Sequence, residues 1–123
     1  MTSQRFSADD RGSASVIGCA VMAALIAITA TLLHVGSVVV ARHRAQAAAD
    51  LSALAVASAL DRGVVAACEV AEPIVSRMRV QVRRCEIDGW YAEFEVTARV
   101  SSLFGGEVAT AVARAGPAAA SGG

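Results

Sequence analysis

Residues 13–41 read SASVIGCAVMAALIAITATLLHVGSVVVA, and this stretch decides the fold. It contains no Asp, Glu, Lys or Arg, while Arg11 precedes it and Arg42 follows it. A helix of about 20 apolar residues crosses the roughly 30 Å hydrocarbon core of a bilayer. The stretch is therefore long enough to span a membrane. We expect a cytoplasmic leader at residues 1–12 and a single transmembrane helix at residues 13–41.

A cleavable signal peptide is the main alternative reading of an apolar segment near the N-terminus. The apolar region of a signal peptide is usually about 7 to 15 residues long and ends in a small-residue cleavage site. The sequence Ala45-Gln46-Ala47 has the form of such a site, but it lies beyond a basic cluster. The length of the run favours a permanent anchor over release of a secreted protein.

Residues 42–61 are expected to extend the anchor helix beyond the membrane. They are rich in Ala, Leu, Arg and Gln, and Gly63 is the first Gly or Pro after Gly36. These residue types favour helix, and a glycine readily ends one. Apolar residues at spacings of three and four predict a packing face on this extension. That face consists of Ala47, Leu51, Leu54, Ala55 and Ala59.

A small α+β domain is predicted at residues 62–116. A short helix is expected at residues 65–78, and Pro73 either kinks it or starts it anew. Residues 90–100, WYAEFEVTARV, alternate apolar and polar side chains, with Trp90 first on the apolar face. This alternation is the period of a half-buried strand. The apolar residues just before it predict a partner strand.

The turn signals place these strands in one antiparallel sheet. A two-residue Asp88-Gly89 loop predicts a type I′ hairpin. Apolar positions in the first strand change from even to odd at Arg83-Arg84, which predicts a bulge. The pair Gly105-Gly106 is expected to turn the chain into a third strand over residues 107–114. The predicted fold is thus a long transmembrane helix followed by a short helix and a three-stranded antiparallel sheet, with a flexible tail at residues 117–123.

Cys68 and Cys85 lie outside the apolar run, on the expected short helix and first strand. Packing of these elements allows either a disulfide or two buried thiols, and we favour the disulfide. A disulfide requires an oxidising compartment. The charges point the other way, because Arg42 and Arg44 after the span weakly favour a cytoplasmic C-terminal side. The sequence alone therefore leaves the orientation contested.

The residue pattern does not indicate an enzyme. Once His34 is assigned to the span and His43 to the membrane surface, no histidine is left for a nucleophilic site or a zinc cluster. The basic residues are all arginines, and they are scattered rather than aligned on a stripe that could neutralise phosphates. We therefore expect no catalytic residues, no cofactor, no metal, no nucleic acid and no small-molecule substrate.

Two short segments resemble a known family. The run RGSASV at residues 11–16 opens directly into an apolar helix, and RHRAQAAADLSALA occupies residues 42–55 after the span. Both are similar to the TadE/TadG-like proteins of Flp-type (tight adherence) pili. With the Cys68 and Cys85 pair and the closing ARAGP at residues 113–117, the chain resembles the shortened actinobacterial branch of that group.

The resemblance implies a pilin-like, or pseudopilin, component of a pilus or secretion apparatus. Its partners would be the membrane and other subunits, reached through the apolar helix, and its C-terminal domain would lie outside the cytoplasm. In processed family members the cut follows a glycine, here Gly12, so that Ser13 becomes the new N-terminus. A glutamate lies five residues after that glycine in those members, but this chain has Ile17 there. A single-pass membrane adaptor or regulator that does not enter a filament is the alternative.

Overall fold

The computed structural model describes residues 7–101 and 105–118. It contains α1 (Ser7–Ser58), a 3-10 turn η1 (Leu60–Arg62), α2 (Val64–Glu69), α3 (Glu72–Met78), β1 (Val80–Asp88), β2 (Tyr91–Arg99) and β3 (Val108–Ala115). The chain divides into two compact units, residues 1–35 and 36–123. The first unit contains the N-terminal part of α1. The second unit contains the rest of α1 and all other elements.

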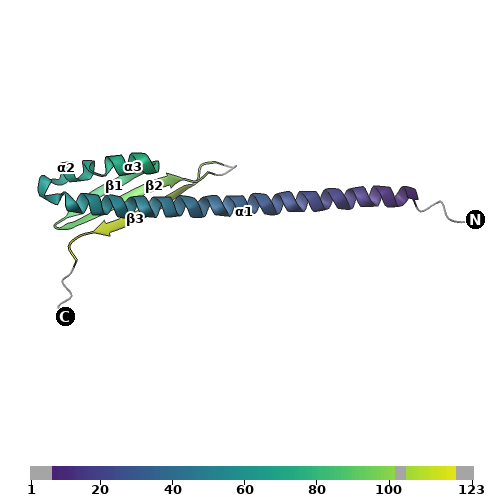
Figure 1. The fold of residues 1–123 in the computed structure, drawn as a ribbon, viewed down its shortest axis with the longest axis horizontal. Coiled ribbons are helices and arrows are strands. Elements are labelled where there is room, and N and C mark those ends of the chain that lie inside the picture. The colour runs from purple at the N-terminus through teal and green to yellow at the C-terminus, as the bar shows by residue number, and fades with distance from the viewer. Residues whose placement is uncertain (1–6, 102–104, 119–123) are drawn as a thin grey trace, which may run out of the picture. The chain divides into compact units, whose positions relative to one another are not determined.

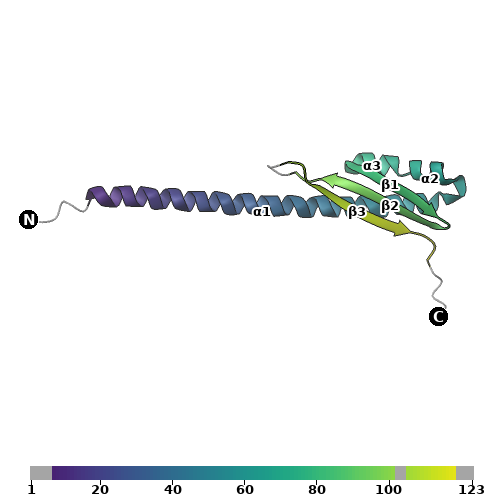
Figure 2. The same ribbon diagram turned by 180° about the vertical axis from the view of Figure 1, so that it is seen from behind.

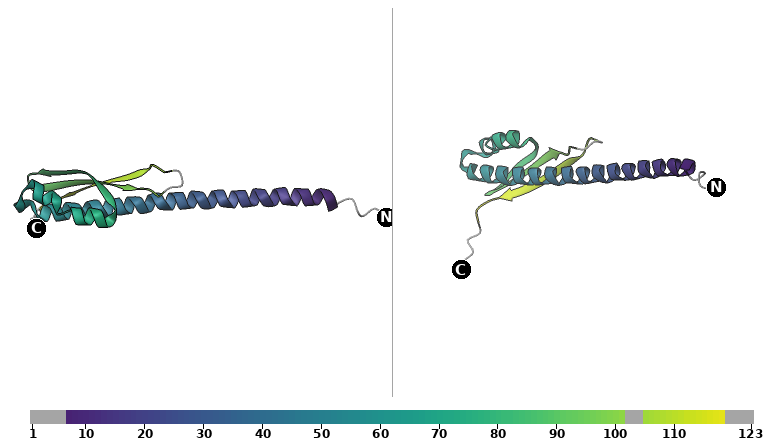
Figure 3. Two further views of the ribbon diagram at one scale, coloured as in Figure 1. Left: turned by 90° about the horizontal axis from the view of Figure 1, so that it is seen from above. Right: turned by 45° about the vertical axis from the view of Figure 1, so that its right-hand side comes forward.

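The second unit is a two-layer arrangement of a sheet and helices. The three strands form an antiparallel sheet in the order β1-β2-β3. The C-terminal part of α1 and the pair α2 and α3 lie on the same face of this sheet (Figures 1 and 3). Side chains of a strand alternate between its two faces, so alternate residues point away from the helices. The expected long helix followed by a short-helix and three-stranded domain is confirmed.

The core between these layers is built mainly from small side chains. Phe94, Val56, Val96 and Ser52 are the largest fully buried side chains in the described part of the chain. The remaining core residues are largely alanines of α1, α2, the segments that join the helices, and the sheet: Ala45, Ala48, Ala49, Ala53, Ala59, Ala67, Ala71, Ala92, Ala98, Ala111 and Ala113. Such residues let helix and sheet approach closely, but each contributes little buried apolar area.

The packing face expected for the helix extension is largely wrong. Leu51 and Leu54 are 51% and 62% exposed, while Ala49, Ser52 and Ala53 face the sheet. Ala59 alone of the expected set is fully buried. The reason is steric, because a sheet that rests on a helix at close range accepts Ala and Ser at the contact and excludes Leu.

The segment around Pro73 forms two short helices rather than one. α2 ends at Glu69 and α3 begins at Glu72, with Pro73 in the first turn of α3. Proline is tolerated there because the N–H groups of the first turn have no partner within the helix. The expectation that the helix starts anew at Pro73 is confirmed.

The hairpin between β1 and β2 is present, but its loop is shifted by one residue. Asp88 pairs with Tyr91, so the loop consists of Gly89 and Trp90. Gly89 has a φ of 60°, whereas Trp90 does not have a positive φ. A positive φ at the first loop residue alone is the pattern of a type II′ turn, so the predicted type I′ turn is wrong. Trp90 accordingly lies in the turn, 72% exposed, rather than on the inward face of the strand.

The bulge and the third strand are where the sequence indicates. The β1–β2 register shifts between Val82 and Arg84, which leaves Arg83 as the extra residue of the predicted bulge. β3 pairs with β2 without interruption, from Ala92 opposite Ala115 to Arg99 opposite Val108. Positive φ values at both Gly105 and Gly106 precede this strand. Residues 1–6 of the expected leader and 119–123 of the expected tail lie outside the described residues.

Candidate functional site

The predicted membrane segment of α1 is exposed throughout its N-terminal part. Every side chain from Gly12 to Thr29 is exposed, including large apolar side chains such as those of Leu25 and Ile26. This is the described helix that is long and apolar enough to cross a membrane. A helix that is apolar on all sides needs an apolar environment around it, either lipid or other helices.

The two threonines within this segment are compatible with that environment. The Oγ1 of Thr29 donates a hydrogen bond to the Leu25 carbonyl, and the Oγ1 of Thr31 donates one to the Ala27 carbonyl, both at 2.8 Å. A hydroxyl without a partner costs several kcal/mol in hydrocarbon, on the order of 4–8 for a medium that offers no hydrogen bonds. Because the helix itself satisfies these hydroxyls, they do not oppose insertion into a bilayer.

The predicted processing site lies on the surface of α1. Gly12 and Ser13 are both exposed. A Cβ placed on Gly12 would meet no heavy atom within 4 Å outside the neighbouring backbone of its own helix. Ile17, at the position where processed family members have glutamate, is 62% exposed. Gly12 and Ser13 are therefore accessible, and cleavage after Gly12 stays a prediction.

Cys68 and Cys85 are brought together by the packing of α2 against the sheet. Their sulfur atoms form a disulfide, with 6.2 Å between the two Cα atoms. The bond links α2 to β1 across a sequence separation of 17 residues. Closing a loop of this length stabilises a fold by about 3 kcal/mol relative to the open chain. For a core built mainly from alanine, that contribution is a large part of the expected stability.

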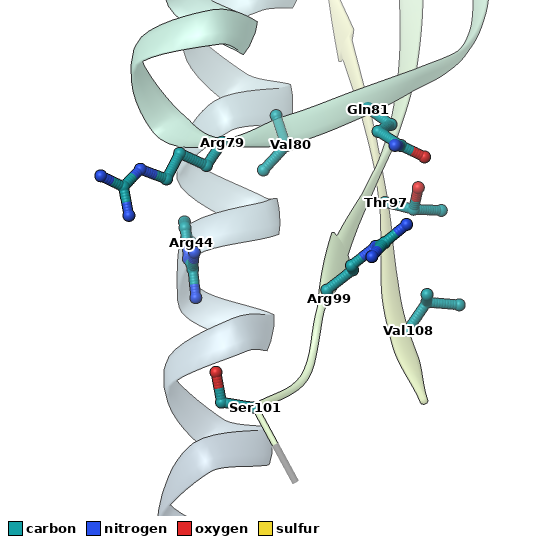
Figure 4. A pocket seen from close by; sticks show the side chains of 8 residues that line it. All are labelled: Arg44, Arg79, Val80, Gln81, Thr97, Arg99, Ser101 and Val108. Atoms are coloured by element: carbon teal, nitrogen blue, oxygen red, sulfur yellow. The ribbon is translucent and has the colours of Figure 1, made fainter. Parts of the chain in front are cut away.

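A cavity of about 410 Å³ in the second unit has three arginines in its lining, Arg44, Arg79 and Arg99. These side chains do not surround one point. Arg79 points away from Arg99 and Gln81 (Figure 4). The cavity is thus not a converging anion site. Within residues 7–101 and 105–118, there is likewise no group of three or more His, Cys, Asp or Glu side chains that could hold a metal ion.

Sequence reasoning missed the surface where α1 passes the outer strand β3. A groove of about 560 Å³ lies there, lined by Val39, Arg42, His43 and Gln46 of α1 and by Thr110 and Ala111 of β3. The four α1 residues have the spacing of one helix face, which is the signal that could have identified it. Finding the groove also requires knowing which strand lies beside that face, and the sequence does not provide this.

In the part of the chain that the structure describes, these features define a class of protein: a small disulfide-linked α+β domain that follows one exposed apolar helix. Residues 12–59 match the family described as putative Flp pilus-assembly TadE/G-like. Over residues 12–59, the resemblance expected from residues 11–16 and 42–55 is confirmed. The apolar helix and this match support a location in a membrane and a part in pilus assembly. The actinobacterial branch stays a prediction.

One relative is apoptosis inhibitor Rv3654c of Mycobacterium tuberculosis (strain ATCC 25618 / H37Rv), which is 52% identical over 48 residues. The aligned residues cover 39% of this chain and 57% of that protein, so the chain matches little more than half of the relative's length. No solved structure matches the chain significantly.

Proposed function

We propose that this chain is a membrane-anchored, pilin-like (pseudopilin) structural component of a Flp/Tad-type pilus or secretion apparatus, without catalytic activity. The observation that carries the proposal is the extent of the family match. It covers residues 12–59, which include both the exposed apolar segment and the extension that packs under the sheet. In this proposal α1 is both the membrane anchor and the surface that packs against other subunits.

The exposed side chains of the apolar segment explain why other subunits would bind there. Full burial of one Val, Leu, Ile or Met side chain is favourable by about 1.5–3 kcal/mol relative to exposure in water. Val16, Met22 and Leu33 are each more than half exposed, and other residues of the segment are similar. A subunit that leaves the bilayer for a filament must therefore replace lipid with neighbouring helices. The small residues Gly18, Ala20, Ala23, Ala24, Ala27 and Ala30 permit close approach of such helices.

The proposed orientation places the domain of residues 62–116 outside the cytoplasm. The Cys68–Cys85 bond supports this side, because disulfides persist in oxidising compartments and are rare in the cytosol. The distribution of basic residues favours the opposite orientation only weakly, since it rests mainly on Arg42 and Arg44. Thiol labelling of a Cys19→Ala variant in intact cells tests the orientation. We expect Cys68 and Cys85 to react only after reductant is added. Labelling without reductant, and only after lysis, would place the domain inside.

The N-terminus of the protein recovered from membranes tests the pilin-like role. Processing predicts a chain that begins at Ser13. A Gly12→Leu variant should keep its leader, because the peptidase of this family cuts after glycine. Gly18→Leu is the matched control, since Gly18 lies on the same helix with open space around its Cα. A wild-type chain that retains residues 1–12 in the presence of the pilus peptidase argues against processing.

One observation favours the alternative of a membrane adaptor or regulator. Ile17 replaces the glutamate that processed family members carry, so the chain lacks a carboxylate to pair with a neighbouring subunit's new N-terminus. An adaptor would stay in the membrane and keep its leader. Shearing filaments from intact cells separates the two roles. A filament component is recovered with the sheared material, whereas an adaptor remains entirely with the cell membranes.

A further inference from the structure

β3 offers an unprotected edge of the sheet. Within the described sheet the strand pairs with β2 only, and it forms the lower edge of the sheet in Figure 2. The opposite edge strand, β1, contains the bulge at Arg83 and several charged residues. Bulges and charges are the usual means by which proteins prevent further pairing at an edge. β3 has an uninterrupted register with β2 and a single charged residue, Arg114. The two edges therefore differ, and β3 is the one open to another strand.

The register identifies the backbone groups that face outward from β3. The N–H of Val100 donates a hydrogen bond of 3.0 Å to the carbonyl of Glu107, the residue opposite it when the β2–β3 register is extended by one pair. In an antiparallel ladder, pairs that bond each other directly alternate with pairs that do not. The odd-numbered residues of β3 therefore bond to β2. The N–H and C=O groups of Val108, Thr110, Val112 and Arg114 point to the free edge.

The groove beside this edge has a basic wall. Arg42, His43 and Gln46 of α1 line it together with Thr110 and Ala111 of β3. Neither Arg42 nor His43 makes a side-chain ion pair with any residue that the structure describes. Gln46 uses its Nε2 to donate to Asp50 Oδ1 at 2.9 Å. An occupant of the groove thus meets a row of free backbone groups on one side and an available guanidinium on the other.

We propose that this groove binds an extended, acidic segment of a partner protein, which adds to the sheet as a fourth strand beside β3. Strand addition satisfies the outward backbone groups, and alternate side chains of the added strand face α1, where Arg42 favours carboxylates. A second copy of this chain fits less well, because its β3 would bring Arg114 and no carboxylate. A lipid headgroup would satisfy Arg42 but leave the strand edge unpaired.

The test uses the full chain in nanodiscs of zwitterionic phosphatidylcholine and two fluorescent octapeptides. One peptide alternates valine and glutamate, and its twin has lysine in place of glutamate. We expect the glutamate peptide to bind at least tenfold more tightly by fluorescence anisotropy. Its binding should slow hydrogen exchange of β3 amides at least tenfold. Arg42→Ala should reduce the preference for glutamate at least threefold. Equal binding of the two peptides, or no binding of either, overturns the proposal.

A matched pair of variants isolates the strand edge. Thr110→Pro removes one outward N–H and keeps the bonds between β3 and β2, whereas Thr110→Ala keeps that N–H. We expect the proline variant not to bind the glutamate peptide and the alanine variant to bind it as the wild type does. Unchanged binding by a folded proline variant contradicts strand addition. If Thr110→Cys chains instead cross-link to one another without peptide, the edge belongs to a second copy. If Arg42→Ala weakens only the attachment of the protein to phosphatidylglycerol vesicles, the groove binds lipid headgroups. Either result refutes the proposal.

The proposed pilus role does not depend on strand addition at β3, because the shearing and N-terminal sequencing experiments do not involve the groove.

Discussion

Removal of the Cys68–Cys85 bond is expected to destabilise the C-terminal domain strongly. The bond closes a loop with a sequence separation of 17 residues. The chain-entropy relation gives about 3 kcal/mol for such a loop, and each factor of ten in an equilibrium constant is about 1.4 kcal/mol. The population of the unfolded domain should therefore rise by about two orders of magnitude in a Cys68→Ala/Cys85→Ala variant.

Hydrogen exchange of the full chain in detergent micelles measures this change directly. Amides of β2, the central strand, exchange through global opening of the domain. We expect their exchange to accelerate about 100-fold in the double variant, and to the same extent when the wild-type bond is reduced. Cys19→Ala is the control, because Cys19 is an exposed free cysteine on α1. Acceleration of less than threefold would show that the alanine-rich core does not depend on the bond, and our account of the domain's stability would be wrong.

Four further substitutions test the packing and the anchor. Ser52→Ala should leave the free energy of unfolding unchanged or raise it by up to about 1 kcal/mol, because Ser52 Oγ is buried without a hydrogen-bond partner in the described structure. A clear fall in the melting temperature would show that the hydroxyl has a partner. Ala53→Leu should cost about 1–3 kcal/mol in denaturant titrations, because Ala53 is buried against the sheet. Leu54→Ala should cost less than about 0.5 kcal/mol, because Leu54 is exposed. A larger cost for Leu54→Ala than for Ala53→Leu would place the packing face where the sequence suggested. Ile26→Arg should lower the membrane-inserted fraction in a translocation assay, since a central arginine costs about 2.5–3.5 kcal/mol; unchanged insertion would contradict a span centred there.

The elements of this fold that could be predicted are those with strong local signals. The uncharged run at residues 13–41 indicated the anchor, and the alternation after Trp90 indicated β2. The change of apolar parity at Arg83 located the bulge, because a half-buried strand must restore its inward face after an extra residue. Each of these signals depends on near neighbours in the sequence. No knowledge of the tertiary arrangement was needed to read them.

The features that sequence reasoning missed depend on contacts between distant elements. Leu51 and Leu54 are more hydrophobic than Ala49 and Ala53, so hydropathy alone places the leucines inside. The sheet lies too close to α1 for that arrangement, and the small residues are buried instead. The groove beside β3 was missed for the same reason, because its basic wall and its strand edge come from distant parts of the sequence.

Membrane extraction of the full chain tests the central claim most directly. If the apolar part of α1 spans the bilayer, the protein should stay with the membrane pellet after washes with high salt and with alkaline carbonate. It should become soluble only when detergent is added, because burial of the span in lipid does not depend on charge. Recovery of a dispersed, monomeric chain in the carbonate supernatant without detergent would contradict the account.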